Sequence, residues 1–149
     1  MRISFKGDYA LKTILDLSCN YNKGLARISD IAKRQDIPIK YLEQILLLLK
    51  GAGYVNSKRG PDGGYFLAKK PSEITVGEVI RLTEGFTSPI SCVSKSCYVK
   101  CNDELKCAFR PLWKDVRDLI NGVVDKVTYQ DMCERKERVE KKTIVNYEI

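Results

Sequence analysis

Histidine is absent from the 149 residues of this chain. Its absence excludes metal sites with imidazole ligands and catalytic sites with an imidazole base. Long apolar runs are missing too, because the longest clear aliphatic run, Ile45–Leu49, is far shorter than the about 20 residues that span a bilayer. The first residues are charged where a signal peptide needs an apolar stretch. We therefore expect a cytoplasmic protein with no membrane partner, in which thiols stay reduced.

The chain also lacks internal repeats, low-complexity linkers and a Cys-x-x-Cys redox motif. With 44% hydrophobic and 30% charged residues, its composition is that of an ordinary globular protein. The net charge is +7, and most of the excess lies in residues 1–90, which carry 14 Lys+Arg and 9 Asp+Glu. This balance favours an anionic partner such as nucleic acid.

The first half of the chain has the pattern of a winged helix-turn-helix. We expect helices over residues 9–20, 30–35 and 38–50, with Asp8 and Ser29 as N-caps of the first two. Gly51 and Gly53 end the third helix, which Pro38 begins. Two β-prone runs follow, residues 54–57 and 65–68, and the segment between them is basic and rich in glycine. Such a module reads DNA.

Two features predict how the second half is organised. Thr75 and Glu78 form a capping box that opens a helix ending at Gly85. Apolar residues then recur at steps of three and four over residues 109–127, which predicts a long amphipathic helix. Its wide apolar stripe favours a dimer interface over packing within one chain. The last residues, 129–149, form a charged tail, either a solvated helix or disordered.

Four of the six cysteines crowd into residues 92–107, which read CVSKSCYVKCNDELKC. Thiolates are ligands for iron–sulfur clusters and equally for tetrahedral zinc, and the nearby lysines favour the thiolate form. The spacing alone leaves both metals open, although no Cys-x-x-Cys knuckle is present. Of the other two cysteines, Cys19 is expected to be a small buried hydrophobe. Cys133 lies in the charged tail.

The run YLEQILLLLKGAGYVNSKRGPDGGYFLA resembles the signature of the iron–sulfur-cluster regulator family of bacterial winged-helix transcription factors, which includes IscR, NsrR and CymR. The opening MRISFKGDYALKTILDLS and the cysteine stretch followed by FRPLWKDV resemble it too. The resemblance implies a homodimer with a long crossing helix, and a [2Fe-2S] or [4Fe-4S] cluster bound just before that helix. It implies Cys92, Cys101 and Cys107 as ligands.

Two further ligand candidates remain open under this resemblance. Cys97 departs from the three-cysteine pattern, so it is a fourth ligand, a replacement for Cys101, or no ligand. Asp8 stands where one branch of the family uses an aspartate from the partner subunit, but an N-cap role explains it equally well.

The expected DNA contacts lie on the third helix and on the wing. Lys40, Tyr41, Glu43 and Gln44 have suitable chemistry for the major groove, because glutamine pairs with adenine and glutamate accepts from cytosine. Similar proteins place the arginine at the position of Arg59 in the minor groove, and Lys58 stands beside it. The neighbouring amides at Ser29 suit a phosphate, although capping alone explains this serine.

We therefore predict a mainly α fold with a small β-hairpin, a winged helix-turn-helix followed by a dimerisation helix. The expected function is that of a non-enzymatic regulator, such as a repressor, which binds two-fold symmetric half-sites in double-stranded DNA and senses redox, nitric oxide or iron–sulfur status. The alternatives are the same DNA reader with structural zinc or a thiol–disulfide switch, and a cysteine-based oxidoreductase. The expected divisions are 1–85 for DNA binding, 86–108 for the cluster loop, 109–128 for dimerisation and 129–149 for the tail.

Overall fold

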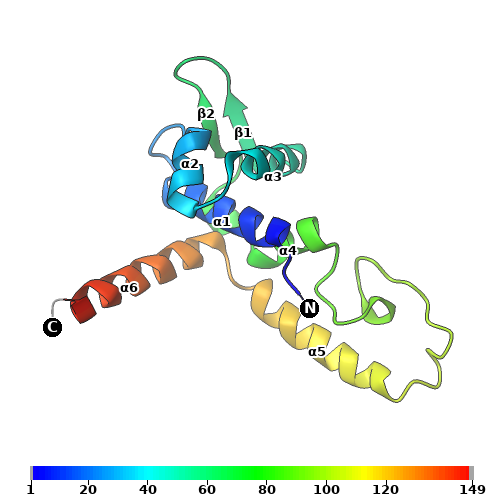
Figure 1. Ribbon diagram of the computed structural model, residues 1–149. Helices are drawn as coiled ribbons and strands as arrows, with labels where there is room; N and C mark the ends of the chain where they lie inside the picture. The colour runs from blue at the N-terminus through cyan, green and yellow to red at the C-terminus, as the bar shows by residue number, and fades with distance from the viewer. Residues whose placement is uncertain (1, 148–149) are drawn as a thin grey trace.

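The computed structural model describes the backbone of residues 2–147 and the side chains of residues 2–144. Helices dominate the described residues, which contain one antiparallel hairpin. The hairpin lies at one end of the folded molecule (Figure 1). This confirms the predicted fold class. The elements are α1 (Phe5–Cys19), α2 (Ile28–Gln35), α3 (Ile39–Gly51), β1 (Val55–Lys58), β2 (Gly64–Leu67), the 3-10 turn η1 (Pro71–Glu73), α4 (Val76–Glu84), the 3-10 turn η2 (Ser91–Val93), α5 (Phe109–Val124) and α6 (Tyr129–Tyr147).

Helix α1 begins one turn earlier than the sequence pattern predicted. Its N-cap is Ser4, whose hydroxyl accepts a hydrogen bond from the Gly7 amide at 3.1 Å. The Glu84 carboxylate at the end of α4 accepts from both the amide and the hydroxyl of Ser4. The prediction that Asp8 caps this helix is therefore wrong. Asp8 lies in the first turn and pairs with Lys12 at 2.7 Å.

The turn between α2 and α3 agrees with the predicted break. Asp36 adopts a left-handed conformation with φ of 51°, and Pro38 is the N-cap of α3. The predicted cap of α2 is wrong, however, because Arg27 is the N-cap and Ser29 lies inside the first turn. The Arg27 carbonyl accepts from the amides of Asp30 and Ile31, which starts the helix before Ser29.

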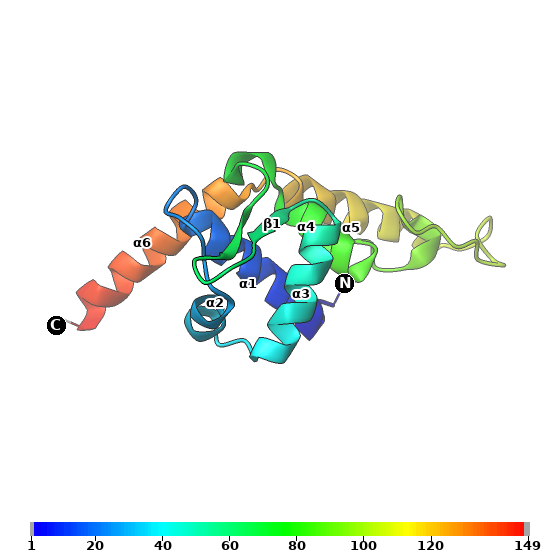
Figure 2. The same ribbon diagram turned by 90° about the horizontal axis from the view of Figure 1, so that it is seen from above.

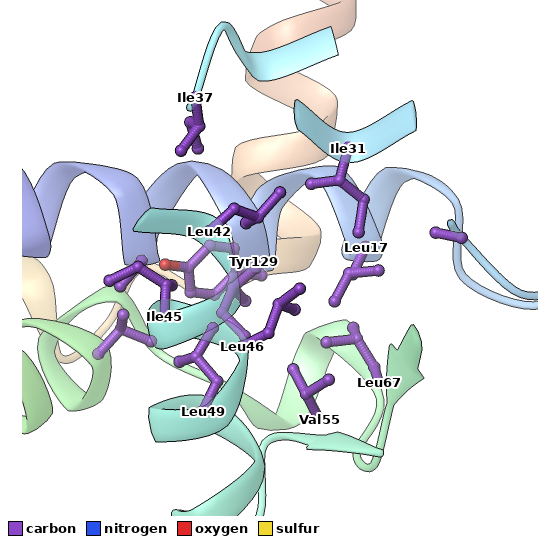
Figure 3. Packing of buried hydrophobic residues seen from close by; sticks show 14 of the residues in the cluster. Leu17, Ile31, Ile37, Leu42, Ile45, Leu46, Leu49, Val55, Leu67 and Tyr129 are labelled. Atoms are coloured by element: carbon purple, nitrogen blue, oxygen red, sulfur yellow. The ribbon is translucent and has the colours of Figure 1, made fainter. Parts of the chain in front are cut away.

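The hydrophobic core lies where α1, α2, α3 and the hairpin meet (Figure 3). On α3, the residues at helical spacing point inward, and Leu42 and Leu49 have no exposed surface. Tyr129, the first residue of α6, reaches into the same core and is 2% exposed. The start of the charged tail is therefore part of this core, because an aromatic side chain that is fully buried contributes a large apolar area.

An ion pair between a buried carboxylate and a half-exposed arginine links α1 to α2. Asp16 on α1 is 1% exposed, and both of its oxygens accept from Arg34 on α2, at 2.8 and 2.7 Å. The Gln35 amide donates to the same carboxylate at 3.0 Å. This hydrogen bond with Asp16 raises the pKa of Arg34. These contacts therefore join the first two helices of the predicted DNA-reading module, residues 1–85.

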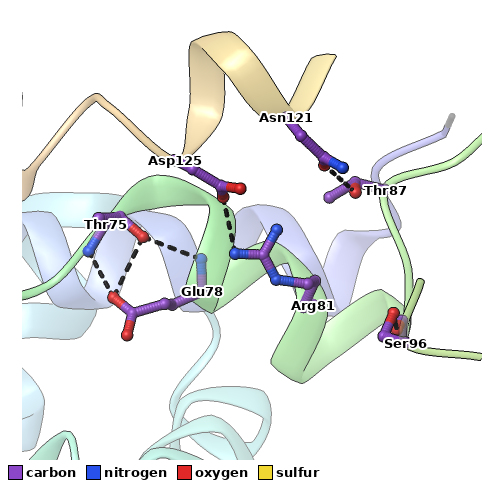
Figure 4. A network of polar contacts seen from close by, with 8 residues as sticks. Thr75, Glu78, Arg81, Thr87, Ser96, Asn121 and Asp125 are labelled. Atoms are coloured by element: carbon purple, nitrogen blue, oxygen red, sulfur yellow. Dashed lines mark hydrogen bonds and ion pairs between the residues drawn. The ribbon is translucent and has the colours of Figure 1, made fainter. Parts of the chain in front are cut away.

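Helix α4 connects the core to α5 through polar contacts (Figure 4). The predicted capping box is present, since the Thr75 hydroxyl accepts from the Glu78 amide at 3.3 Å and Glu78 accepts from the Thr75 amide at 2.7 Å. Further along α4, Arg81 pairs with Asp125 at the end of α5 at 2.6 Å. Gly85 ends α4 with φ of 82°, which agrees with the predicted stop.

Helices α5 and α6 leave the core in different directions, as the two views in Figures 1 and 2 show. Residues 86–108, between α4 and α5, form an extended loop on the side of α5. No helix among the described residues is both long enough and apolar enough to cross a membrane.

Candidate DNA interface and cysteine loop

The outward face of α3 carries all four residues that were predicted to contact DNA from this helix. Lys40, Tyr41, Glu43 and Gln44 are exposed, and the residues between them face the core. An exposed polar face on the second helix of a helix-turn-helix is the arrangement that enters a major groove.

The wing is held in shape by its glycines. The strands pair with Val55 opposite Leu67 and Lys58 opposite Gly64, so Arg59 stands at the start of the connecting turn. Both Lys58 and Arg59 are exposed. A Cβ on Gly63 would lie 2.2 Å from the carbonyl oxygen of Lys58, and this backbone cannot yield as a flexible side chain would. Only glycine therefore fits this turn without a shift of the wing.

A surface groove runs between α2, α3 and the wing. Four of the predicted residues line it together: Ser29, Glu43, Lys58 and Arg59. Tyr41 and Gln44 lie apart from it and line a second hollow, with Phe5 and Tyr9 of α1. The groove therefore brings Glu43, which was predicted to contact a base, and the two wing cations to one surface.

Two basic residues in this groove were missed by the sequence analysis. Arg27 donates to the Pro61 carbonyl in the wing at 3.3 Å, which links the start of α2 to the wing. Lys50 at the end of α3 donates to the Ser57 hydroxyl at 2.7 Å. Only the fold reveals them, because the packing of α2, α3 and the wing brings both residues to this groove. Four cations against one carboxylate make the groove suitable for phosphate.

The four clustered cysteines lie along a loop with little regular structure. Cys92 is buried in η2, and Cys107 is half-buried just before α5. Cys97 and Cys101 are exposed between them. No helix or strand is formed over residues 94–108. All four are free thiols.

Polar contacts attach this cysteine loop, residues 92–107, to α5 near both of its ends. Arg117 of α5 donates to the Val93 carbonyl at 2.7 Å, beside Cys92. Near the other end, Arg110 pairs with Glu104, which also accepts from the Tyr98 hydroxyl at 2.5 Å. The hydrogen bond with Glu104 raises the pKa of Tyr98, and the same bond lowers the pKa of Glu104. Glu104 is therefore a carboxylate at neutral pH.

Cys97 is held close to the end of α4. Its thiol donates to the Gly85 carbonyl at 3.2 Å, and its amide donates to the Ser94 hydroxyl at 2.9 Å. The Ser96 hydroxyl reaches the same Gly85 carbonyl at 2.8 Å (Figure 4). Cys97 therefore lies against the protein, whereas Cys101 projects from the loop.

The donor chemistry of the loop fits an iron–sulfur cluster. Thiolates are the ligands that such clusters use, and free cysteines on an irregular segment can rearrange around one. Among the described residues, no three side chains of the metal-ligating kinds lie together in this conformation. The structure thus carries the donors on one segment without regular secondary structure and does not assemble them.

Asp8 occupies a different surface. It lines a hollow with Arg2, Ser4, Phe5 and Glu84, and its side chain is 44% exposed. Because Ser4 performs the capping, the Asp8 carboxylate is left to its ion pair with Lys12 among the residues that the structure describes.

Comparison with known proteins places the chain among bacterial regulators. Residues 3–135 match the Rrf2 family, described as iron-dependent transcriptional regulators. The HTH-type transcriptional regulator IscR of Escherichia coli O1:K1 / APEC is 36% identical over 137 residues, which cover 92% of this chain and 83% of IscR. The solved structure of CymR, the global cysteine regulator of B. subtilis, is 35% identical with a TM-score of 0.78, and covers 91% of this chain and 98% of CymR. T. potens IscR is 31% identical with a TM-score of 0.74, over 93% of this chain and 90% of that protein.

The helix-turn-helix, the hairpin wing and the basic groove between them therefore define a winged-helix transcription regulator rather than an enzyme. The match over nearly the whole length identifies the particular group: this chain belongs to the Rrf2 family. The resemblance seen in the sequence is confirmed.

Proposed function

We propose that this regulator works in the cytoplasm as a homodimeric repressor that senses redox, nitric oxide or iron–sulfur status through a cluster bound by Cys92, Cys101 and Cys107. The observation that carries the proposal is the cysteine loop, which bears four free thiols and is attached at both ends to α5. The family description, iron-dependent transcriptional regulator, and the 36% identity to IscR support it. A bound cluster supplies a centre that reacts with oxidants and nitric oxide.

The DNA contacts follow from the exposed face of α3 and the wing. Lys40, Tyr41, Glu43 and Gln44 enter the major groove, where the glutamate and glutamine side chains read bases. Arg59 enters the adjacent minor groove, and Lys58, with the amides at Ser29, contacts phosphates.

A second copy of this chain covers the apolar face of α5. No residue of α5 is buried, although several are large and apolar. Leu119 is 72% exposed, and Val123 and Phe109 are each 63% exposed. An apolar stripe of this length left to water is unfavourable, and a two-fold dimer buries the same stripe on both partners. The dimer also provides two DNA-reading modules, one for each of two half-sites that lie about 34–36 Å apart on the DNA.

Changes in the conformation of the cysteine loop are transmitted to the DNA-reading module through α5. Arg117 and Arg110 hold the loop to α5, and the Arg81–Asp125 pair holds α5 to α4. A shift of the loop therefore alters the angle between α5 and the DNA-reading module. Such a bias acts only to the extent that ligation favours one of two conformations.

The first test is anaerobic purification followed by measurement of iron, sulfide, zinc and visible absorption. Iron with matching sulfide supports the proposal, whereas zinc without sulfide overturns it. Ala substitutions at Cys92, Cys101 and Cys107 should each abolish cluster loading, and Cys19→Ser, outside the loop, should retain it. If Cys101→Ala keeps a full cluster and Cys97→Ala loses it, Cys97 is the middle ligand. Asp8→Ala tests the carboxylate in the same assay.

A thiol–disulfide switch within the loop is the second candidate. The crystal structure of an oxidized form of Staphylococcus aureus CymR, 31% identical with a TM-score of 0.72, favours it, because a similar regulator exists in an oxidized form. Two exposed thiols, Cys97 and Cys101, suit such chemistry. A chain that binds no iron but loses DNA affinity on oxidation would support it.

The dimer has its own test. Leu119→Lys should convert the dimer to a monomer in sedimentation experiments. Val139→Lys on α6, where the valine is also 63% exposed, is the matched control and should remain a dimer. A dimer that survives Leu119→Lys contradicts the assignment of α5.

A further inference from the structure

The two cysteines outside the loop lie against each other. Cys19 is the last residue of α1 and Cys133 belongs to the second turn of α6, and their sulfur atoms are 2.9 Å apart. They are separated by 114 positions in the sequence, so only the packing of α6 on α1 brings them together. Both are half-buried free thiols.

The helices that carry these sulfurs are firmly placed. In α1, Leu17 lies in the core, and Asp16 is paired with Arg34 of α2. In α6, Tyr129 is buried, and its amide donates to the Ile74 carbonyl at 2.9 Å. The contact between the two sulfurs is therefore built into the fold, rather than being a chance encounter of mobile side chains.

A disulfide needs little change from this arrangement. The bond length is about 2.05 Å, so the sulfurs must approach by about 0.9 Å, which small rotations of the two side chains provide. Half-burial leaves a route for a small reagent. Burial, together with the hydrogen bond with Cys19, raises the pKa of Cys133 to about 12. Cys133 is therefore a thiol at neutral pH, which disfavours it as the first attacking sulfur.

We propose that Cys19 and Cys133 form a redox-active pair, which a low-molecular-weight disulfide oxidises to an internal disulfide that locks α6 onto α1. Cys19 loses its proton to water and attacks one sulfur of the reagent, whose S–S bond breaks and releases one thiolate. Cys133 then loses its proton and attacks the Cys19 sulfur, and the second thiolate leaves. The two protein thiols are oxidised, and the reagent is reduced to two thiols that take up the two protons.

The consequence of the lock concerns the DNA-reading module. Helix α1 packs against α2 and α3, and α6 follows directly after α5, the helix that we assign to the dimer. The disulfide would link α6, which follows the α5–α6 connection, covalently to α1 of the DNA-reading module. This site is distinct from the cysteine loop and acts whether or not the loop binds a cluster.

The test is chemical and uses the full chain. The reduced protein is equilibrated anaerobically with glutathione buffers of increasing oxidised fraction, then quenched in acid, alkylated and digested with trypsin. Cleavage after Lys and Arg places Cys19 in peptide 13–23 and Cys133 in peptide 127–135, and neither contains another cysteine. We expect these two peptides to be joined to each other, in material with the mass of one chain, by a bond that excess reductant reverses.

Two single variants test the order of the steps, and a third variant separates this site from the loop. Cys133→Ser should accumulate glutathione on Cys19, whereas Cys19→Ser should leave Cys133 unmodified. A variant with serine at all four loop positions should form the 13–23 to 127–135 link at the same glutathione ratio as the natural chain. The proposal is overturned if Cys19 or Cys133 joins a loop cysteine, if the link is between two chains, or if both stay reduced while the loop oxidises. Each outcome is independent of whether iron is bound.

Discussion

Replacing Arg34 by alanine should destabilise the DNA-reading module, because it removes the cation that is paired with the buried carboxylate of Asp16. Asp16 is 1% exposed and loses two charge-assisted hydrogen bonds, of 2.8 and 2.7 Å, in Arg34→Ala. Hydrogen bonds to charged groups contribute about 1.5–3 kcal/mol, and removing one partner of a fully buried pair costs about 3–5 kcal/mol.

The arginine side of the pair moderates this cost. The Arg34 side chain is 43% exposed, so water enters the space that it vacates, and Gln35 still donates to Asp16 at 3.0 Å. We therefore expect a loss of about 2 kcal/mol, below the range for a fully buried pair. At about 2–4 °C for each kcal/mol in a chain of this size, the melting temperature should fall by about 4–8 °C.

The assay is thermal unfolding at one fixed protein concentration, because the stability of a dimer depends on concentration. Arg138→Ala, which removes an exposed arginine from α6, should change stability by less than about 0.5 kcal/mol. Adding Asp16→Asn to Arg34→Ala should cost little more, since the uncompensated charge is then gone. The reasoning fails if Arg34→Ala has the melting temperature of the natural chain. It also fails if the losses in stability from Arg34→Ala and Asp16→Asn are simply additive in the double variant.

Four further predictions follow from particular contacts. Arg59→Ala should weaken DNA binding and flatten its dependence on salt by about one unit of slope, whereas Lys141→Ala on α6 should not; equal affinity over a salt series would refute the wing assignment. Gln44→Ala should cost about 1–3 kcal/mol on the preferred operator and relax the preference at one base pair, which binding to a set of single-substituted operators measures. Hydrogen bonds from Thr128 lower the pKa of Asp131 below that of an ordinary aspartate, so its contribution to stability is present above the ordinary aspartate pKa and is lost as the pH falls through the lowered value. Acid unfolding of Asp131→Asn should accordingly be less steep below about pH 4 than that of the natural chain, and an identical profile would contradict this. The Cys19–Cys133 disulfide, which closes a loop of over 100 residues, should raise the free energy of unfolding by about 4 kcal/mol relative to the reduced chain, and Cys133→Ser, which cannot close this loop, should show no such gain in the oxidant.

Much of the reading module was predictable because its signals act over a few residues. Asp36 and Pro38 break the chain between two helices, and Thr75 with Glu78 opens α4, all through local backbone geometry and hydrogen bonds. The caps of α1 and α2 were predicted wrongly because local signals alone do not select one cap. Several side chains near a helix start are able to cap it, and Glu84, distant in sequence, favours Ser4 over Asp8.

The sequence by itself therefore determined the order of helices, the wing and the four-cysteine loop, since each is written in local spacing. Only the tertiary structure decided that Tyr129 belongs to the core, that Arg34 neutralises Asp16, and that Cys19 meets Cys133. These contacts join helices that are remote along the chain. They depend on how apolar faces pack together, and packing is settled by the whole core at once rather than by the pattern of any one segment.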